Sequence, residues 1–126
     1  MSDGSFDLVV SSLQADAADT RSLVEALATK LERALPAETH VERKAAKLLS
    51  RDKRVTRIDV RLGDLNYALR MEGDRERTQR SKTSGGIVIK SEELSLEAWL
   101  AALADTLRAE AQRSESTRLA LERLLS

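Results

Sequence analysis

The sequence predicts an α+β fold with a long N-terminal helix, a small antiparallel sheet of three to five strands and a long C-terminal helix. Helical periodicity fills both ends of the chain, whereas strand alternation fills its centre. Charge divides at the same boundaries, with a net charge of −5 over residues 1–42, +8 over 43–90 and −3 over 91–126. Because both observations separate the same three segments, we expect two helices to cover one face of a central sheet.

The chain of 126 residues has an ordinary length for one domain. Its apolar content of 41% and charged content of 33% are typical of a soluble globular protein. We therefore expect a single α+β domain over 1–126, with a helical arm at 5–34, a sheet region at 38–90 and a second helical arm at 95–125.

The N-terminal arm carries apolar or small residues at alternating spacings of four and three, the pattern of a helix that packs along its length. The series is Phe6, Val10, Leu13, Ala17, Thr20, Val24, Leu27, Leu31 and Ala34. The pattern weakens at 16–20, and Ser22 and Glu25 have the spacing of a capping box, so the arm is either continuous or broken near 18–22. Pro36 ends it, because the residue before a proline avoids helical angles.

The segment 37–54 fits two interpretations. Residues 39–45 have the length of a short edge strand, but Val41, Ala45 and Leu48 also have helical spacing. We favour a strand at 39–45 followed by a basic loop at 50–54, and the sequence leaves the choice between strand and helix over 39–49 open.

The segments 55–62 and 65–72 predict a β-hairpin. Gly63 and Asp64 form a two-residue connection, which a glycine fits into a primed turn. In that register the facing pairs are Leu62 with Leu65, Val60 with Tyr67, Ile58 with Leu69, and Thr56 with Met71. Every apolar side chain except Val55 then lies on one face, and a slip of one residue would destroy this agreement.

The segment 75–83 contains no apolar side chain, so it predicts a solvated edge strand or a loop. Ile87, Val88 and Ile89 follow, and they predict a short strand that is central or half covered. Glu92 and Glu93 come next, at a position where acidic residues favour the start of a helix.

In the C-terminal arm, Ser95 is the expected N-cap, with Glu97 in the first turn. A helical apolar stripe follows at Leu96, Trp99, Leu100, Leu103 and Leu107. Residues 110–118 are nearly all polar, so the arm is either one helix with a solvated middle or two helices joined near 114–116.

The expected arms are longer than the expected sheet. A helix of about 30 residues spans ~45 Å, whereas a strand of about eight residues spans ~26 Å. Either the arms fold back on each other or a second copy covers the overhang, most simply in a two-fold dimer. The expected oligomer contacts are the apolar residues at the end of the chain, Leu119, Leu121, Leu124 and Leu125.

Composition and spacing argue against an enzyme. The chain has no cysteine, which excludes disulfides and thiolate chemistry. Its one histidine, His40, has no cluster of partner residues, and the acidic pairs Asp74/Glu76 and Glu92/Glu93 fit solvated turns better than a catalytic pair. We therefore expect no catalytic residue, no cofactor and no metal.

The basic centre is the one segment with a functional interpretation. In the predicted hairpin register, Arg57, Arg61 and Arg70 share the solvated sheet face, and Arg77 and Arg80 are expected to extend it as contacts for an anion or a partner. Three observations weigh against a nucleic acid: the chain has no net charge, Asp59 and Glu72 interrupt the face, and no aromatic residue joins it for base stacking.

From the sequence we expect a non-catalytic interaction protein, a scaffold or adaptor that forms a homodimer and binds an unidentified protein partner. The alternative is a nucleic-acid-binding module of the nucleoid-associated type that uses the basic sheet face. Abundant arginine and alanine with a single asparagine suggest a bacterial source. With neither a secretory signal pattern nor an apolar run near ~18 residues, we expect a cytoplasmic protein without membrane insertion.

Overall fold

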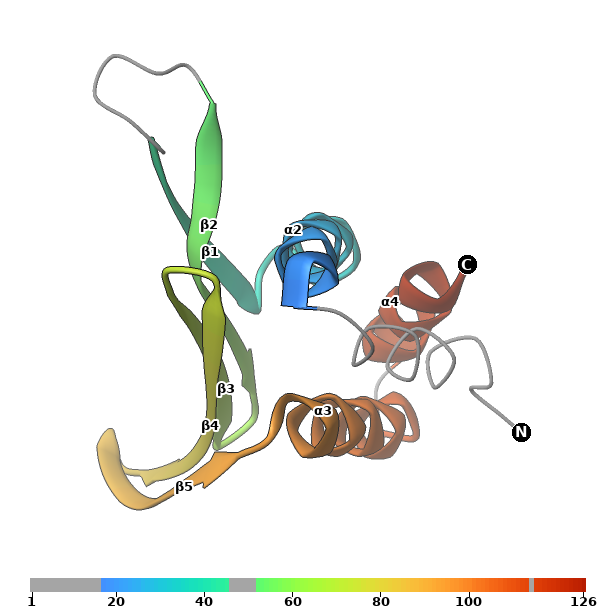
Figure 1. Cartoon of the computed structure of the whole chain (residues 1–126). Coiled ribbons are helices and arrows are strands. Elements are labelled where there is room, and N and C mark those ends of the chain that lie inside the picture. The colour runs from blue at the N-terminus through green and yellow to red at the C-terminus, as the bar shows by residue number, and fades with distance from the viewer. Residues whose placement is uncertain (1–16, 46–51, 114) are drawn as a thin grey trace.

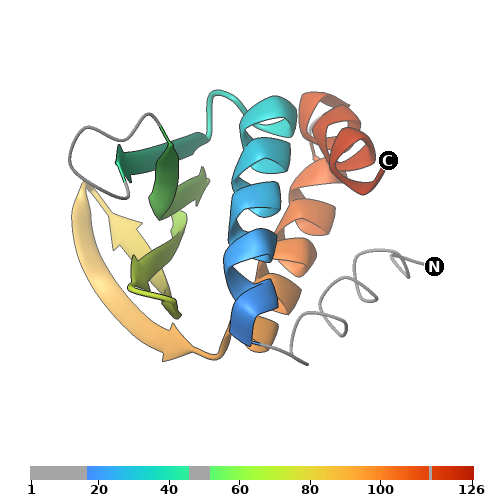
Figure 2. The ribbon, with the colours of Figure 1, turned by 45° about the horizontal axis from the view of Figure 1, so that its top comes forward.

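The computed structural model describes residues 17–45, 52–113 and 115–126, and it confirms the α+β fold. The elements in chain order are α2 (Ala17–Ala34), β1 (Thr39–Ala45), β2 (Lys53–Leu62), β3 (Leu65–Glu72), β4 (Arg75–Ser84), β5 (Ile87–Leu94), α3 (Leu96–Ala111) and α4 (Glu115–Leu125). The strands form one antiparallel sheet in the order β1-β2-β3-β4-β5. Helices α2 and α3 cover one face of the sheet, and α4 packs on their outer side (Figure 1, Figure 2).

The described part of the N-terminal arm is one continuous helix. Helix α2 runs without a break through 18–22, so the break considered from the sequence does not occur there. The predicted apolar series is confirmed from Thr20 onward, because its members are buried against the sheet and the other helices: Thr20, Val24, Leu27, Leu31 and Ala34. Pro36 follows the end of the helix at Ala34, as predicted. Phe6, Val10 and Leu13 lie outside the described residues.

The hairpin is confirmed in the predicted register from the Arg57–Arg70 pair to the turn, whereas the predicted pair of Thr56 with Met71 is not among the paired residues. Leu62 faces Leu65, Val60 faces Tyr67, and Ile58 faces Leu69. Gly63 in the turn has a φ angle of +62°, a left-handed conformation that glycine adopts without strain. The strand interpretation of 39–45 is also confirmed, because β1 pairs with β2 along this segment.

A β-bulge in β2 corrects the position of Val55. Glu42 of β1 pairs with Arg57 but Arg43 pairs with Val55, so Thr56 is an extra residue in β2. This extra residue shifts the alternation by one position, and Val55 becomes fully buried on the helix-facing side of the sheet. The alternation rule placed Val55 on the opposite face because that rule assumes an unbroken ladder.

Two side chains of α2 bind the backbone at this bulge. The Glu25 carboxylate accepts a hydrogen bond from the Val55 N–H at 2.8 Å. The Arg21 guanidinium donates to the Val55 carbonyl at 2.8 Å and to the Gly73 carbonyl at 2.8 Å. Arg21 and Glu25 also contact each other at 3.4 Å. This ion pair therefore satisfies backbone groups near the bulge and joins α2 to two parts of the sheet.

We expect Arg21→Ala to lower the free energy of unfolding by about 1–3 kcal/mol, because the part-buried Val55 carbonyl and the exposed Gly73 carbonyl lose a charged donor. Urea denaturation measures this change. The matched control is Arg33→Ala, at an exposed position of the same helix, which we expect to change stability by less than about 0.5 kcal/mol. Equal effects of the two substitutions would contradict the assigned role of Arg21.

The second half of the sheet differs from the sequence prediction. The polar segment 75–83 is not an edge strand or a loop, because β4 lies between β3 and β5. Strand β5 begins with the aliphatic triplet but continues through Glu92 and Glu93 to Leu94, so the two acidic residues belong to a strand. Strand β5 is therefore the edge of the sheet, and its aliphatic residues are neither central nor half covered.

Helix α3 begins where the sequence predicts and is fixed to the sheet by polar contacts. The Ser95 hydroxyl caps the helix by accepting a hydrogen bond from the Ala98 N–H at 3.1 Å. The buried Trp99 indole donates to the Gln79 carbonyl at 3.1 Å, and the Tyr67 hydroxyl donates to the Ala102 carbonyl at 3.1 Å. The two aromatic rings pack edge to face with centroids 6.2 Å apart.

The C-terminal arm consists of two helices, since α3 ends at Ala111 and α4 begins at Glu115, which resolves the alternative left open by the sequence. Helix α4 turns back and packs on α2 and α3 (Figure 1). Ala120 and Leu124 are buried in the same core as the sheet residues. The arm therefore folds back within the chain, the first of the two solutions considered for the expected overhang.

Candidate functional site

One face of the sheet carries no described helix, and we call it the open face (Figure 1). Strand alternation places described side chains of β2, β3 and β4 on it. Among them are Arg57, Asp59, Arg61, Asn66, Ala68, Arg70, Glu72, Arg75, Arg77, Gln79 and Ser81. Of the arginines predicted to share a face, Arg57, Arg61, Arg70 and Arg77 do so.

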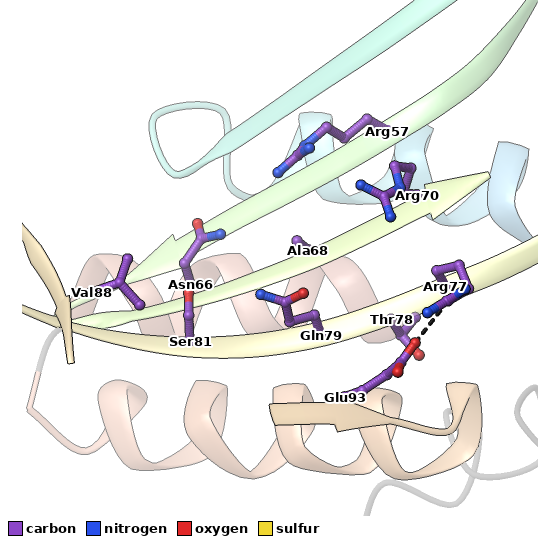
Figure 3. Close-up of a pocket in the computed structure, with 10 residues that line it drawn as sticks. All are labelled: Arg57, Asn66, Ala68, Arg70, Arg77, Thr78, Gln79, Ser81, Val88 and Glu93. Atoms are coloured by element: carbon purple, nitrogen blue, oxygen red, sulfur yellow. Dashed lines mark hydrogen bonds and ion pairs between the residues drawn. The ribbon is translucent and has the colours of Figure 1, made fainter. Parts of the chain in front are cut away.

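The open face contains a shallow pocket with a volume of about 370 Å³ (Figure 3). Arg57, Arg70 and Arg77 come from three neighbouring strands and lie at one end of it. Ala68 forms a low point at the centre because its side chain is short, and Val88 of β5 lies at the other end. Arg61 is on the same face but does not line the pocket, since its guanidinium contacts the Thr83 hydroxyl at 3.3 Å.

The arginines of the pocket are paired with carboxylates of the same face. Arg57 binds Asp59 at 2.7 Å, and Arg77 binds Glu93 at 2.7 Å. Glu72 lies 3.3 Å from Arg70 and 3.7 Å from Arg77. Positive charge on this part of the open face is thus balanced by carboxylates within the sheet.

Hydrogen bonding to these carboxylates strengthens the protonated state of the arginines. The hydrogen bond that Arg57 donates to Asp59 raises the pKa of the Arg57 guanidinium, and the bond that Arg77 donates to Glu93 raises the pKa of Arg77. Both guanidinium groups are cations at every physiological pH. The pocket therefore offers charged hydrogen-bond donors, and these already bind carboxylates of the same chain.

Arg80 does not belong to the open face. It pairs across the strands with the buried Tyr67, so its side chain lies on the helix-facing side. There its guanidinium binds Glu92 of β5, and this hydrogen bond raises the pKa of Arg80 and lowers the pKa of Glu92. Arg77 and Arg80 are three positions apart, and the two-residue period of a strand places such residues on opposite faces.

The feature that sequence reasoning missed is a group of exposed aliphatic residues on β5, which we call the aliphatic edge. It consists of Ile87, Val88 and Ile89, which are 69%, 57% and 58% exposed. Lys82 pairs with Lys90 while Thr83 pairs with Val88, so Ile89 is an extra residue that forms a bulge. The end of the β4–β5 hairpin bends away from the helices (Figure 1), and Val88 thereby borders the open-face pocket.

The leucines expected at an oligomer interface occupy different positions in the chain. Leu124 is buried in the core, and Leu121 and Leu125 are partly buried and pack against it. Leu119 is 43% exposed and lines a separate pocket between the end of α2 and α4. Leu119 is therefore the most exposed of the four leucines, and it offers a partner more surface than the other three.

The described residues contain no group of three or more histidine, aspartate or glutamate side chains that could hold a metal ion. His40 is an exposed residue of β1, and its imidazole lies 3.8 Å from the Glu42 carboxylate. Glu92 and Glu93 have side chains on opposite faces of β5, bound to Arg80 and Arg77. In the same part of the chain, no helix has both the length and the apolar character needed to cross a membrane.

No protein family model matches the chain, and no curated protein or solved structure is significantly similar to it.

Proposed function

We propose that this chain is a non-catalytic interaction protein, a scaffold or adaptor that forms a homodimer and binds other proteins. The observation that carries the proposal is the aliphatic edge beside the open face. Three consecutive aliphatic side chains, each more than half exposed, lie on the edge strand β5. Contiguous exposed apolar surface bordered by polar residues is typical of protein interaction sites.

The two edges of the sheet support this choice. Strand β1 at the other edge exposes charged or polar residues, among them His40, Glu42, Arg43 and Lys44, which discourage pairing with another strand. Arg43 also binds Glu32 of α2 at 2.7 Å, which ties β1 to the helix layer. One edge is thus protected by charge and the other carries aliphatic residues, as expected if β5 meets a partner.

The charge balance of the open face favours a protein partner. Asp59, Glu72 and Glu93 neutralise the pocket arginines, so a phosphate backbone would have to displace or approach bound carboxylates. A protein surface of mixed charge can exchange ion pairs with such a face without a large electrostatic cost. We propose a bacterial cytoplasmic setting for this interaction, on the composition of the chain.

Nucleic-acid binding is the second candidate, because several arginines, among them Arg57, Arg61 and Arg70, lie on the open face. Fluorescence anisotropy with a labelled duplex at low and physiological salt distinguishes the two functions. The proposed function predicts no binding at low salt, the condition that most favours phosphate contacts. Binding that weakens with salt and is lost in the joint Arg57→Ala, Arg61→Ala and Arg70→Ala variant would instead establish the nucleic-acid function.

A further inference from the structure

We propose that the aliphatic edge is the homodimer contact, and that a second copy of this chain docks on it about a two-fold axis that passes near Val88. This inference rests on the proposed homodimer and adds the surface and the geometry of association. Its basis is the self-complementarity of β5, because a two-fold axis brings the same residues of both copies together.

An antiparallel arrangement centred on Val88 matches apolar residues with apolar residues. Val88 faces Val88 of the second copy, and Ile87 faces Ile89. Beyond this centre, Gly86 faces Lys90, so no like charges oppose each other. An axis at Lys90 would instead set two ammonium groups against each other and place aliphatic residues against Glu92 and Glu93, which is unfavourable.

The two acidic residues of β5, Glu92 and Glu93, give no reason to expect a basic partner, because both are already paired. Glu92 is held by Arg80, and Glu93 is held by Arg77, both within the chain. The aliphatic edge is thus the part of β5 with large apolar side chains left to bury, and an uncharged, self-matching surface is what a second copy supplies.

The bulge at Ile89 defines the kind of contact. A bulge interrupts the regular ladder, so the backbone of β5 can pair with another strand only over a short stretch around Val88. Side-chain burial by the six aliphatic residues of two copies therefore provides most of the contact. Since Val88 also borders the open-face pocket, the pockets of both copies lie beside the shared edge.

Charge substitutions test the surface. We expect Val88→Lys to weaken self-association on the order of 100-fold, because two ammonium groups would meet at the axis. His40→Lys places the same charge on the exposed β1 edge and should leave the dimer unchanged. Leu119→Lys tests the rival surface on α4 and should also leave it unchanged. Sedimentation velocity at micromolar concentration measures all three, with circular dichroism to confirm that each variant is folded.

Single cysteines test the axis, since the natural chain has none. Val88→Cys should form an intermolecular disulfide rapidly under mild oxidation, because residues that face each other across a two-fold pair have suitable Cα separations. Ser91→Cys is the matched control: in the Val88-centred arrangement its two copies lie about six residues apart along the strands, roughly 20 Å, too far for a disulfide.

The outcomes separate the two proposals. A monomeric wild type would overturn both the homodimer and its contact. A wild-type dimer that survives Val88→Lys but dissociates with Leu119→Lys would keep the homodimer and overturn the β5 contact. Cross-linking through Ser91→Cys but not through Val88→Cys would overturn the position of the axis.

Discussion

Trp99→Ala is expected to lower the free energy of unfolding by about 3–5 kcal/mol, the range for removing a large buried aromatic side chain. Trp99 is fully buried and packs against Tyr67 between α3 and the sheet. Its indole also donates to the Gln79 carbonyl, which would lose this partner. Urea denaturation followed by circular dichroism measures the change.

Trp99→Phe is the matched control, because phenylalanine keeps most of the buried aromatic area and removes the N–H donor. We expect a loss smaller than that of Trp99→Ala, and it includes about 1–3 kcal/mol for the Gln79 carbonyl left without its donor. A Trp99→Ala variant as stable as the natural chain would contradict the packing of α3 on the sheet.

Leu124→Glu is expected to release α4 from the helix layer and to cost more than Leu124→Ala, for which the range is about 2–5 kcal/mol. Leu124 is buried among α2 and α3, where a carboxylate would lie in an apolar environment without a partner. Hydrogen exchange should show loss of protection over 115–125, together with a lower melting temperature.

Leu119→Glu gives the comparison within the same helix. Leu119 is 43% exposed, so the same substitution should change stability by less than about 0.5 kcal/mol. From the sequence alone, Leu124 is one of the expected oligomer contacts, where a charge would dissociate a dimer. The buried position of Leu124 leads us to expect a folding defect instead, and dissociation of a folded Leu124→Glu chain would contradict this expectation.

The parts of the fold that follow from local pattern were predictable. Ile58, Val60 and Leu62 alternate along one strand and match Leu65 to Leu69 on the next, which fixed the hairpin register. The Ser95 cap and the α3 stripe likewise depend on residues a few positions apart. In each case, the residues that determine the structure are neighbours in the sequence.

The parts that depend on distant contacts were not predictable. The bulge at Thr56 is bound by Arg21 and Glu25, 30 or more positions earlier in the chain. Strand β4 has no apolar side chain to indicate an internal position, and its place in the sheet depends on pairing with β5 along the charged pairs Arg80–Glu92 and Arg77–Glu93. Ion pairs between strands leave no periodic signal in a single sequence.

The candidate site was predictable in part. The shared face of Arg57, Arg61 and Arg70 followed from the hairpin register. Arg80 was placed on the wrong face, although the two-residue period of β4 is enough to put it opposite Arg77. The exposure of Ile87, Val88 and Ile89 ran against the usual expectation that three consecutive aliphatic residues are buried. This contradiction between composition and exposure is the reason for assigning the interaction surface to β5.

Sedimentation equilibrium of the natural chain at micromolar concentrations tests the central claim most directly. Self-association predicts a mass of twice the 13.9 kDa of one chain. It also predicts that this mass persists at high salt, because the contact buries aliphatic surface and not ion pairs. A mass of 13.9 kDa throughout the concentration range would contradict the account.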